Sequence, residues 1–174
     1  MKTITVINGT NRPKNNTLKV SKAFLQKAKE LDFKTNIIDL TNWAELFKEY
    51  ITLDNATEGQ KKDIQKMSKA HIIIIITPTY HHSIPGSLKN FLDCISEKSA
   101  WRHKIVGLVS SSNNADAVKA LELSLNGYLS YTLNGEEVSK TFIAPAKAII
   151  NNREIDEERV TKYIKYLNTF NISI

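Results

Sequence analysis

The chain alternates between short apolar runs and longer segments whose apolar residues recur every three or four positions. A short apolar run predicts a β-strand, and the recurring pattern predicts an amphipathic helix. The expected strands lie at residues 2–8, 34–40, 71–77, 104–110 and 140–150, and the expected helices at residues 16–31, 57–70, 86–98, 117–128 and 156–168. Residues 41–53 follow neither pattern, and we interpret them as irregular chain with room for a short helix over the sheet. Five strands that alternate with helices predict an α/β fold with a parallel sheet.

The strand expected at 71–77 contains five consecutive isoleucines. An unbroken β-branched run predicts a central strand that is covered on both faces, as in parallel sheets. No Pro/Gly-rich linker, low-complexity tract or internal repeat divides the chain, so residues 1–174 are expected to form a single domain. Polar loops follow three of the strands, at residues 9–17, 78–85 and 110–116. In a parallel α/β sheet such loops meet at the carboxyl edge, where these sheets bind ligands.

The first of these loops has the composition of an anion-binding site. Gly9 allows a tight turn. Beside a helix N-terminus, the loop offers hydroxyl, amide and guanidinium donors from Thr10, Asn11, Arg12, Asn15, Asn16 and Thr17. The patterns G-x-x-x-x-G-K-[ST] and G-x-G-x-x-G are absent, so a terminal monophosphate fits better than a nucleoside triphosphate or a dinucleotide. The alternative is an ordinary polar turn in which Asn16 or Thr17 caps the helix.

The second loop carries planar side chains directly after the isoleucine strand. Tyr80, His81 and His82 lie there between two prolines, and such amphipathic groups can border a planar heteroaromatic ring. The alternative makes Tyr80 a partly buried loop anchor and leaves the two histidines exposed to solvent. Since no third metal ligand lies close by in the sequence, we expect no zinc site here.

Composition and charge narrow the functional classes. The net charge is +6, but the lysines and arginines are scattered, so we interpret the excess as favouring solubility and anionic ligands rather than nucleic acid. The longest apolar run, residues 72–76, is too short to cross a bilayer. The first residues enter a strand at once, so we expect no secretory signal. Cys94 is the single cysteine, which excludes an internal disulfide, and these features together predict a cytoplasmic protein.

Two motifs of the chain resemble those of one family. The first is Gly9-Thr10-Asn11-Arg12 followed by Asn16-Thr17. The second is a longer set of spaced residues, namely Pro78, Tyr80, Ser83, Pro85, Gly86, Leu88, Lys89, Asn90 and Asp93. In both motifs the chain is similar to the NAD(P)H-dependent FMN reductases with a flavodoxin-like fold. The resemblance covers nearly the whole chain and is weakest beyond Ser112.

This resemblance implies a flavodoxin-like three-layer sandwich with a five-stranded parallel sheet, and it implies FMN and NAD(P)H as cofactors. The implied ligands of the FMN phosphate are Thr10, Arg12, Asn16 and Thr17. The implied lining of the flavin ring is Pro78, Thr79, Tyr80 and His81, with Ser111 and Asn113 added from the third loop. The chain departs from the family at two points. Many members have asparagine in place of His81, and many have a glycine-rich third loop where this chain has serines and asparagines.

The helix after the second loop carries two structural expectations. Lys89 and Asp93 are four positions apart, so they can pair along the helix rather than take part in catalysis. Cys94 lies among apolar residues of the same helix, and we expect it to act as a small hydrophobic side chain rather than as a redox group or metal ligand.

The implied function is an oxidoreductase that passes electrons from NAD(P)H through bound FMN to a small oxidant, such as a quinone, an azo compound, a metal oxyanion or free flavin. The flavin does the chemistry, so no catalytic side chain is assigned. Relatives often form homodimers or homotetramers, which makes an oligomer the expected state, with neither nucleic acid nor membrane as a partner. The main alternative is a flavodoxin-like FMN electron carrier without nicotinamide activity, although such carriers are usually acidic. A fold relative that has lost its flavin is the third interpretation.

Overall fold

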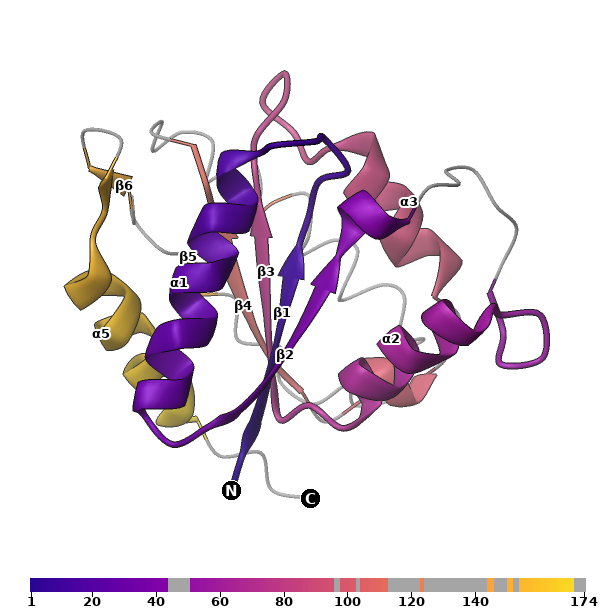
Figure 1. Ribbon diagram of the computed structural model, residues 1–174, viewed down its shortest axis with the longest axis horizontal. Coiled ribbons are helices and arrows are strands. Elements are labelled where there is room, and N and C mark those ends of the chain that lie inside the picture. Colours follow the sequence, from indigo (N-terminus) through magenta and orange to yellow (C-terminus); the bar gives the residue numbers. More distant parts are fainter. Residues whose placement is uncertain are drawn as a thin grey trace.

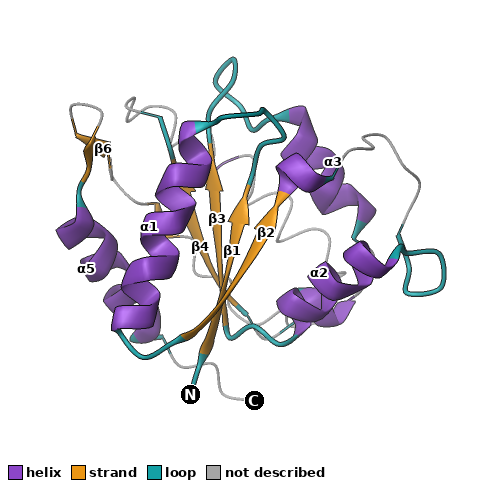
Figure 2. Cartoon of the chain, in the orientation of Figure 1, coloured by secondary structure: helices purple, strands orange, loops and turns teal. Residues whose placement is uncertain are grey.

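The computed structural model describes residues 1–43, 51–95, 98–102, 104–112, 123, 144–145, 150–151 and 154–170. Most of the sheet consists of β1 (Thr3–Asn8), β2 (Lys34–Asp39), β3 (Ile72–Thr77) and β4 (Ile105–Ser110). The helices are α1 (Asn16–Glu30), α2 (Glu58–Ser68), α3 (Gly86–Cys94) and α5 (Glu157–Asn168), with short 3-10 helices η1 (Leu40–Asn42) and η2 (Lys98–Ala100). Strands and helices alternate along the chain, as the sequence pattern predicts (Figure 2).

The main sheet is parallel and has the strand order β2-β1-β3-β4-β5. β5 is a two-residue strand, Ala144–Pro145, that pairs with the middle of β4. The fifth strand predicted at 140–150 is therefore seen only as this short segment, since its other residues up to 149 lie outside the described part of the chain. The prediction is wrong at its far end, because β6 (Ile150–Asn151) pairs antiparallel with β7 (Glu154–Ile155) in a separate two-stranded sheet.

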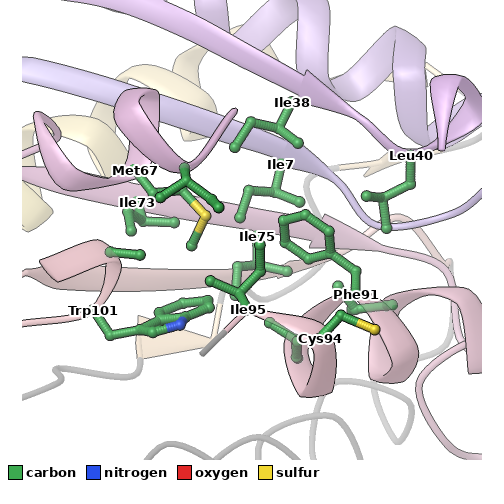
Figure 3. Packing of buried hydrophobic residues seen from close by; sticks show 14 of the residues in the cluster. Ile7, Ile38, Leu40, Met67, Ile73, Ile75, Phe91, Cys94, Ile95 and Trp101 are labelled. Atoms are coloured by element: carbon green, nitrogen blue, oxygen red, sulfur yellow. The ribbon is translucent and has the colours of Figure 1, made fainter. Parts of the chain in front are cut away.

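Helices cover both faces of the sheet, with α1 and α5 on one side and α2 and α3 on the other (Figure 1). The isoleucines of β3 alternate between these two sides. Ile73 and Ile75 pack into the core beneath α2 and α3, where Figure 3 shows Ile75 close to Phe91 and Ile73 close to Met67. The other three belong to the core beneath α1 and α5, namely Ile72, Ile74 and Ile76. All five are fully buried, which confirms the prediction of a central strand covered on both faces.

Polar side chains cap the N-termini of three of the described helices, α1, α2 and α5. At the start of α1, Asn15 Oδ1 accepts a hydrogen bond from Leu18 N at 2.6 Å. At the start of α2, Thr57 and Gln60 form a reciprocal capping box. At the start of α5, Asp156 caps the first turn. Each cap satisfies a backbone N–H group that has no partner within its own helix.

The helix boundaries differ from the sequence pattern mainly after residue 90. α3 ends at Cys94 rather than at residue 98, because Ile95 adopts an extended conformation and forms a parallel bridge with Ile51. The helix predicted at 117–128 lies outside the described residues except at one position. In the irregular segment the described part begins with η1, and residues 44–50 are not described. Of the helices that the structure describes, none has the length and apolar character needed to cross a membrane.

Two basic residues lie at the amino edge of the sheet. Lys104 is buried, and its Nζ donates hydrogen bonds to Ser68 O at 2.6 Å and Ala70 O at 2.8 Å, at the C-terminus of α2. Burial lowers the pKa of Lys104. His71 Nδ1 accepts a hydrogen bond from Thr3 N at 3.1 Å, which links the starts of β1 and β3. Burial, followed by repulsion from nearby positive charges including Lys104, lowers the pKa of His71.

Candidate functional site at the carboxyl edge of the sheet

The loop after β1 is anchored to β3 at its first residue. Gly9 N donates to Ile76 O at 2.7 Å, and Thr77 Oγ1 lies 3.4 Å from Gly9 O. A Cβ atom at residue 9 would lie 2.9 Å from both Ile76 O and Thr77 Cβ, which is too close for any side chain. Glycine is therefore required at this position by the close approach of the loop to β3. The loops after β1 and β3 meet at the upper edge in Figure 1.

Side chains within the first loop hold its backbone. Thr10 is fully buried, and its Oγ1 accepts a hydrogen bond from Arg12 N at 3.2 Å. Asn15 Nδ2 donates to Arg12 O at 2.6 Å. The Arg12 side chain is exposed, and within the described part of the chain no carboxylate pairs with its guanidinium group. A fixed backbone therefore presents an available cation at the surface of this loop.

The first loop leads directly into the N-terminus of α1. The cap is Asn15, so the interpretation that Asn16 or Thr17 caps this helix is wrong. Asn16 is exposed and Thr17 is almost fully buried. The first turn of α1 contains no acidic residue, so its N–H groups keep their partial positive charge. This is the arrangement in which helix N-termini bind phosphate.

Hydroxyl groups connect the three loops that the sequence singled out. Thr17 Oγ1 and Ser111 Oγ are 2.8 Å apart, which joins the loop after β1 to the loop after β4. Thr79 Oγ1 and Ser110 Oγ are 3.4 Å apart, which joins the loop after β3 to the end of β4. The structure thus brings together candidate residues that are far apart in the sequence. Asn113, the remaining candidate of the third loop, lies outside the described residues.

The loop after β3 contains a tight turn built on two histidines. Tyr80 and Ser83 exchange both of their backbone hydrogen bonds, each at 2.9 Å. Between them, His81 has a φ of 49° and His82 a φ of 59°, so both are left-handed, as in a type I′ turn. Both imidazoles and the Tyr80 ring are exposed, whereas Pro78 and Thr79 at the base of the loop are half-buried. The exposure of the histidines agrees with the alternative interpretation of this loop and leaves their rings accessible to a ligand. Tyr80 is exposed as well, so it is not the partly buried anchor of that interpretation.

Helix α3 packs behind this turn. Lys89 Nζ lies 2.6 Å from both carboxylate oxygens of Asp93, which confirms the predicted pair along the helix. Cys94 is buried, in agreement with its expected role as a small hydrophobic side chain. Burial, with a smaller contribution from the neighbouring Asp93 carboxylate, raises the pKa of the Cys94 thiol.

Two polar residues at this edge were missed by the sequence analysis. Asn8 ends β1 and Asp39 ends β2, and the two are direct partners in the sheet register. Asn8 Nδ2 donates to Asp39 Oδ1 at 2.7 Å. A signal for them was present, because each is a polar residue that closes an apolar strand at the predicted ligand-binding edge.

The chemistry of this edge is that of binding and orientation. Hydroxyl, amide and guanidinium donors surround a helix N-terminus, and an exposed aromatic turn stands on the neighbouring loop. These groups suit an anion joined to a planar ring. In the part of the chain that is described, no group of three or more His, Cys, Asp or Glu side chains is arranged to hold a metal ion.

Comparison with known proteins identifies the family. The family model described as NADPH-dependent FMN reductase matches residues 2–148. An NAD(P)H-dependent FAD/FMN reductase of Geobacillus thermodenitrificans is 27% identical over 122 residues, which is 70% of this chain and 62% of that protein. The chain thus spans about three fifths of this relative's length. An NADPH azoreductase of Bacillus sp. (strain OY1-2) is 30% identical over 135 residues, covering 71% of this chain and 68% of that protein.

The fold has similar solved structures. The apo form of an NADH:FMN oxidoreductase superposes with a TM-score of 0.68 at 19% identity, over 97% of this chain and 89% of the other. At that level of identity the likeness concerns the fold alone, whereas the family match covers most of the sequence. The chain belongs to the NADPH-dependent FMN reductase family.

Proposed function

We propose that this protein is an FMN-dependent oxidoreductase that passes electrons from NAD(P)H to a small oxidant, such as a quinone, an azo compound, a metal oxyanion or free flavin. The observation that carries the proposal is the donor-rich loop between β1 and α1, placed next to the aromatic turn after β3. Family membership supports it, since two of the matching relatives are named as reductases that use NAD(P)H or NADPH.

The residues of the first loop fit the phosphate of FMN. The guanidinium of Arg12 has no carboxylate partner in the described part of the chain, and no acidic residue occupies the first turn of α1. Arg12 would supply a charged fork, and Thr10, Asn16 and Thr17 would supply neutral donors or the backbone N–H groups beside them. Because Thr10 Oγ1 already accepts from Arg12 N, its main role would be to fix the loop.

The turn after β3 fits the flavin ring. Tyr80 would form an aromatic wall, and His81 would offer a hydrogen-bond donor to the polar edge of the ring. Pro78 and Thr79 would line the base of the loop. Ser111 and Asn113 would complete the lining from the loop after β4. When bound, FMN supplies the hydride and electron chemistry, and the protein holds the ring and sets its surroundings.

The remaining features belong to the same proposal. The chain would form a single flavodoxin-like FMN-binding domain over residues 1–174, with a full fifth strand around Ala144–Pro145 completing a three-layer sandwich. The strand order β2-β1-β3-β4-β5 supports this, because it is the doubly wound order with its ligand crevice beside β1 and β3. The protein would be cytoplasmic and would form a homodimer or homotetramer. The apolar residues of α3 pack in the core, so a contact through this helix would use its exposed side, which carries Lys89 and Asp93.

A visible spectrum followed by an anaerobic titration tests the function. The purified protein, reconstituted with FMN, should be yellow and should bleach on addition of NADPH or NADH without oxygen. A yellow protein that does not bleach would instead indicate the electron carrier, against which the net charge of +6 already argues. Failure to take up FMN would contradict both assignments.

A further inference from the structure

We infer that Asn8 and Asp39 form a positioning pair that holds the phosphate loop in its binding conformation. The inference rests on the proposed function, since it assumes that the loop after β1 binds the phosphate of FMN. Neither residue belongs to the proposed set of flavin ligands. Both act through the backbone of the loop, so they are positioning residues rather than catalytic ones.

The pair is held by a short hydrogen bond to a charged acceptor. Asn8 and Asp39 face each other across β1 and β2, and Asn8 Nδ2 lies 2.7 Å from Asp39 Oδ1. The same carboxylate oxygen accepts from Thr41 N at 3.0 Å, which caps η1. The end of β2 is thereby fixed, and the orientation of the Asn8 amide is fixed with it, because a flipped amide would place its oxygen against the carboxylate.

The orientation leaves the other end of the amide without a partner. Asn8 is fully buried, and within the described residues no donor reaches its Oδ1. A buried acceptor without a donor destabilises the folded state, whereas an apolar side chain of similar shape would carry no such cost. Asparagine at this position therefore lowers the stability of the folded state. This indicates that its NH₂ group is needed to hold the neighbouring residues in place.

The NH₂ group connects Asp39 to the phosphate loop. Asn8 Nδ2 lies 3.5 Å from Thr10 O, a long contact that places the amide directly beneath the loop. Thr10 Oγ1 in turn accepts from Arg12 N at 3.2 Å, and Arg12 O accepts from Asn15 Nδ2 at 2.6 Å. The contacts run from the end of β2 to the cap of α1 without interruption. A change at Asn8 would therefore shift the loop backbone on which Arg12 is mounted.

The central test compares FMN with riboflavin, which lacks the phosphate, in the Asn8→Leu variant. Flavin fluorescence quenching gives both affinities, and thermal unfolding without ligand gives stability. We expect FMN binding to weaken about tenfold, the effect of one charge-assisted hydrogen bond, while riboflavin binding changes less than about twofold. The variant removes both the unpaired buried oxygen and the hydrogen bond to Asp39, and these two changes act on stability in opposite directions, so the ratio of the FMN and riboflavin affinities decides the test.

Thr5→Val is the matched control. Thr5 is fully buried on the same strand, and its Oγ1 donates to Lys66 O at 2.9 Å, away from the phosphate loop. This variant should lower the melting temperature and leave the ratio of the FMN and riboflavin affinities at the wild-type value. A role of Asn8 in general strand stability would give the same result for both variants and would overturn the inference.

If Asn8→Leu does not fold, variants of Asp39 test whether the pair positions the phosphate loop. Asp39→Asn retains an oxygen acceptor for Asn8 Nδ2 and should keep FMN affinity close to the wild type. Asp39→Ala removes the acceptor and should weaken FMN about tenfold without affecting riboflavin. Equal losses for the two flavins, or unchanged FMN binding in Asp39→Ala, would overturn the inference. If the wild-type protein binds neither flavin, the proposed function itself fails, and this inference fails with it.

Discussion

At the scale of single residues, Arg12 provides the most direct test of phosphate binding. Its backbone is fixed by Thr10 and Asn15, while its guanidinium is available to a ligand. Arg12→Ala should weaken FMN binding by about 1.5–3 kcal/mol, the contribution of a hydrogen bond to a charged group, and leave riboflavin almost unaffected. Lys19→Ala, which removes an exposed cation further along α1, is the control and should change neither affinity appreciably. Equal losses of affinity for FMN and riboflavin in Arg12→Ala would contradict the assignment of Arg12 as a phosphate ligand.

Cys94 is a residue for which we predict little effect. Its side chain is buried behind the second loop, and burial raises the pKa of its thiol, so the reactive thiolate is disfavoured. Cys94→Ala should keep NAD(P)H turnover within a few-fold of the wild type, measured with flavin-saturated protein. A loss of several orders of magnitude with FMN still bound would mean that the thiol takes part in the reaction.

At the scale of elements, the turn after β3 is built without the glycine and asparagine that most often supply its geometry. Both His81 and His82 are left-handed, a conformation that costs most L-residues about 1–2 kcal/mol and that asparagine and glycine adopt more readily. The double variant His81→Asn/His82→Gly should therefore raise the free energy of unfolding, by about 1 kcal/mol at most, in urea denaturation. The control His81→Ala/His82→Ala also removes both imidazoles but keeps both Cβ atoms, and it should bring no gain. Equal gains in the two double variants would show that the imidazoles, rather than the backbone, are the source of strain.

The junction of β1 and β3 at the amino edge gives a pH dependence. His71 Nδ1 accepts from Thr3 N, and the folded state lowers the pKa of His71 below its ordinary value of 6.5. Between the two pKa values the unfolded chain binds more protons, so the free energy of unfolding rises with pH there. The contribution of neutral His71 to the free energy of unfolding is complete above about pH 6.5 and declines as the pH falls below that value.

His71→Asn supplies an oxygen acceptor for Thr3 N that does not titrate. Urea midpoints measured between about pH 5 and 7.5 should fall toward low pH more steeply in the wild type than in this variant. The window stays above the range in which most carboxylates titrate. Curves of the same slope would remove His71 as a source of the pH dependence.

At the scale of the whole molecule, patterns of burial could be predicted from the sequence better than specific contacts. The isoleucine run predicted a strand covered on both faces. The polar loops predicted the edge of the sheet at which Thr17, Thr79 and Ser111 lie together. These features follow from periodicity and from the topology of parallel sheets. Periodicity also placed the four long strands and the four described α-helices to within a few residues.

What the sequence could not supply depends on particular geometries. The cap of α1 is Asn15 rather than Asn16 or Thr17, since neighbouring polar residues have similar capping preferences and only the backbone selects among them. The left-handed turn at His81 and His82 contains no glycine or asparagine, the residues that usually indicate such a turn in a sequence. The contact between Asn8 and Asp39 depends on the register of two strands, which a local pattern does not determine.

The isoleucine strand at the centre of the sheet also affects the protein before it has folded. In the unfolded chain residues 72–76 form an uncharged β-branched segment without proline, the kind that associates with copies of itself in cross-β aggregates. Its native partners lie far away in the sequence on β1 and β4, so the segment remains unprotected until non-local pairing occurs. Lys69 on one side and Pro78 on the other act as gatekeepers that discourage such association. The yield of refolding should accordingly fall as protein concentration rises, because self-association competes with the slow closure of the sheet.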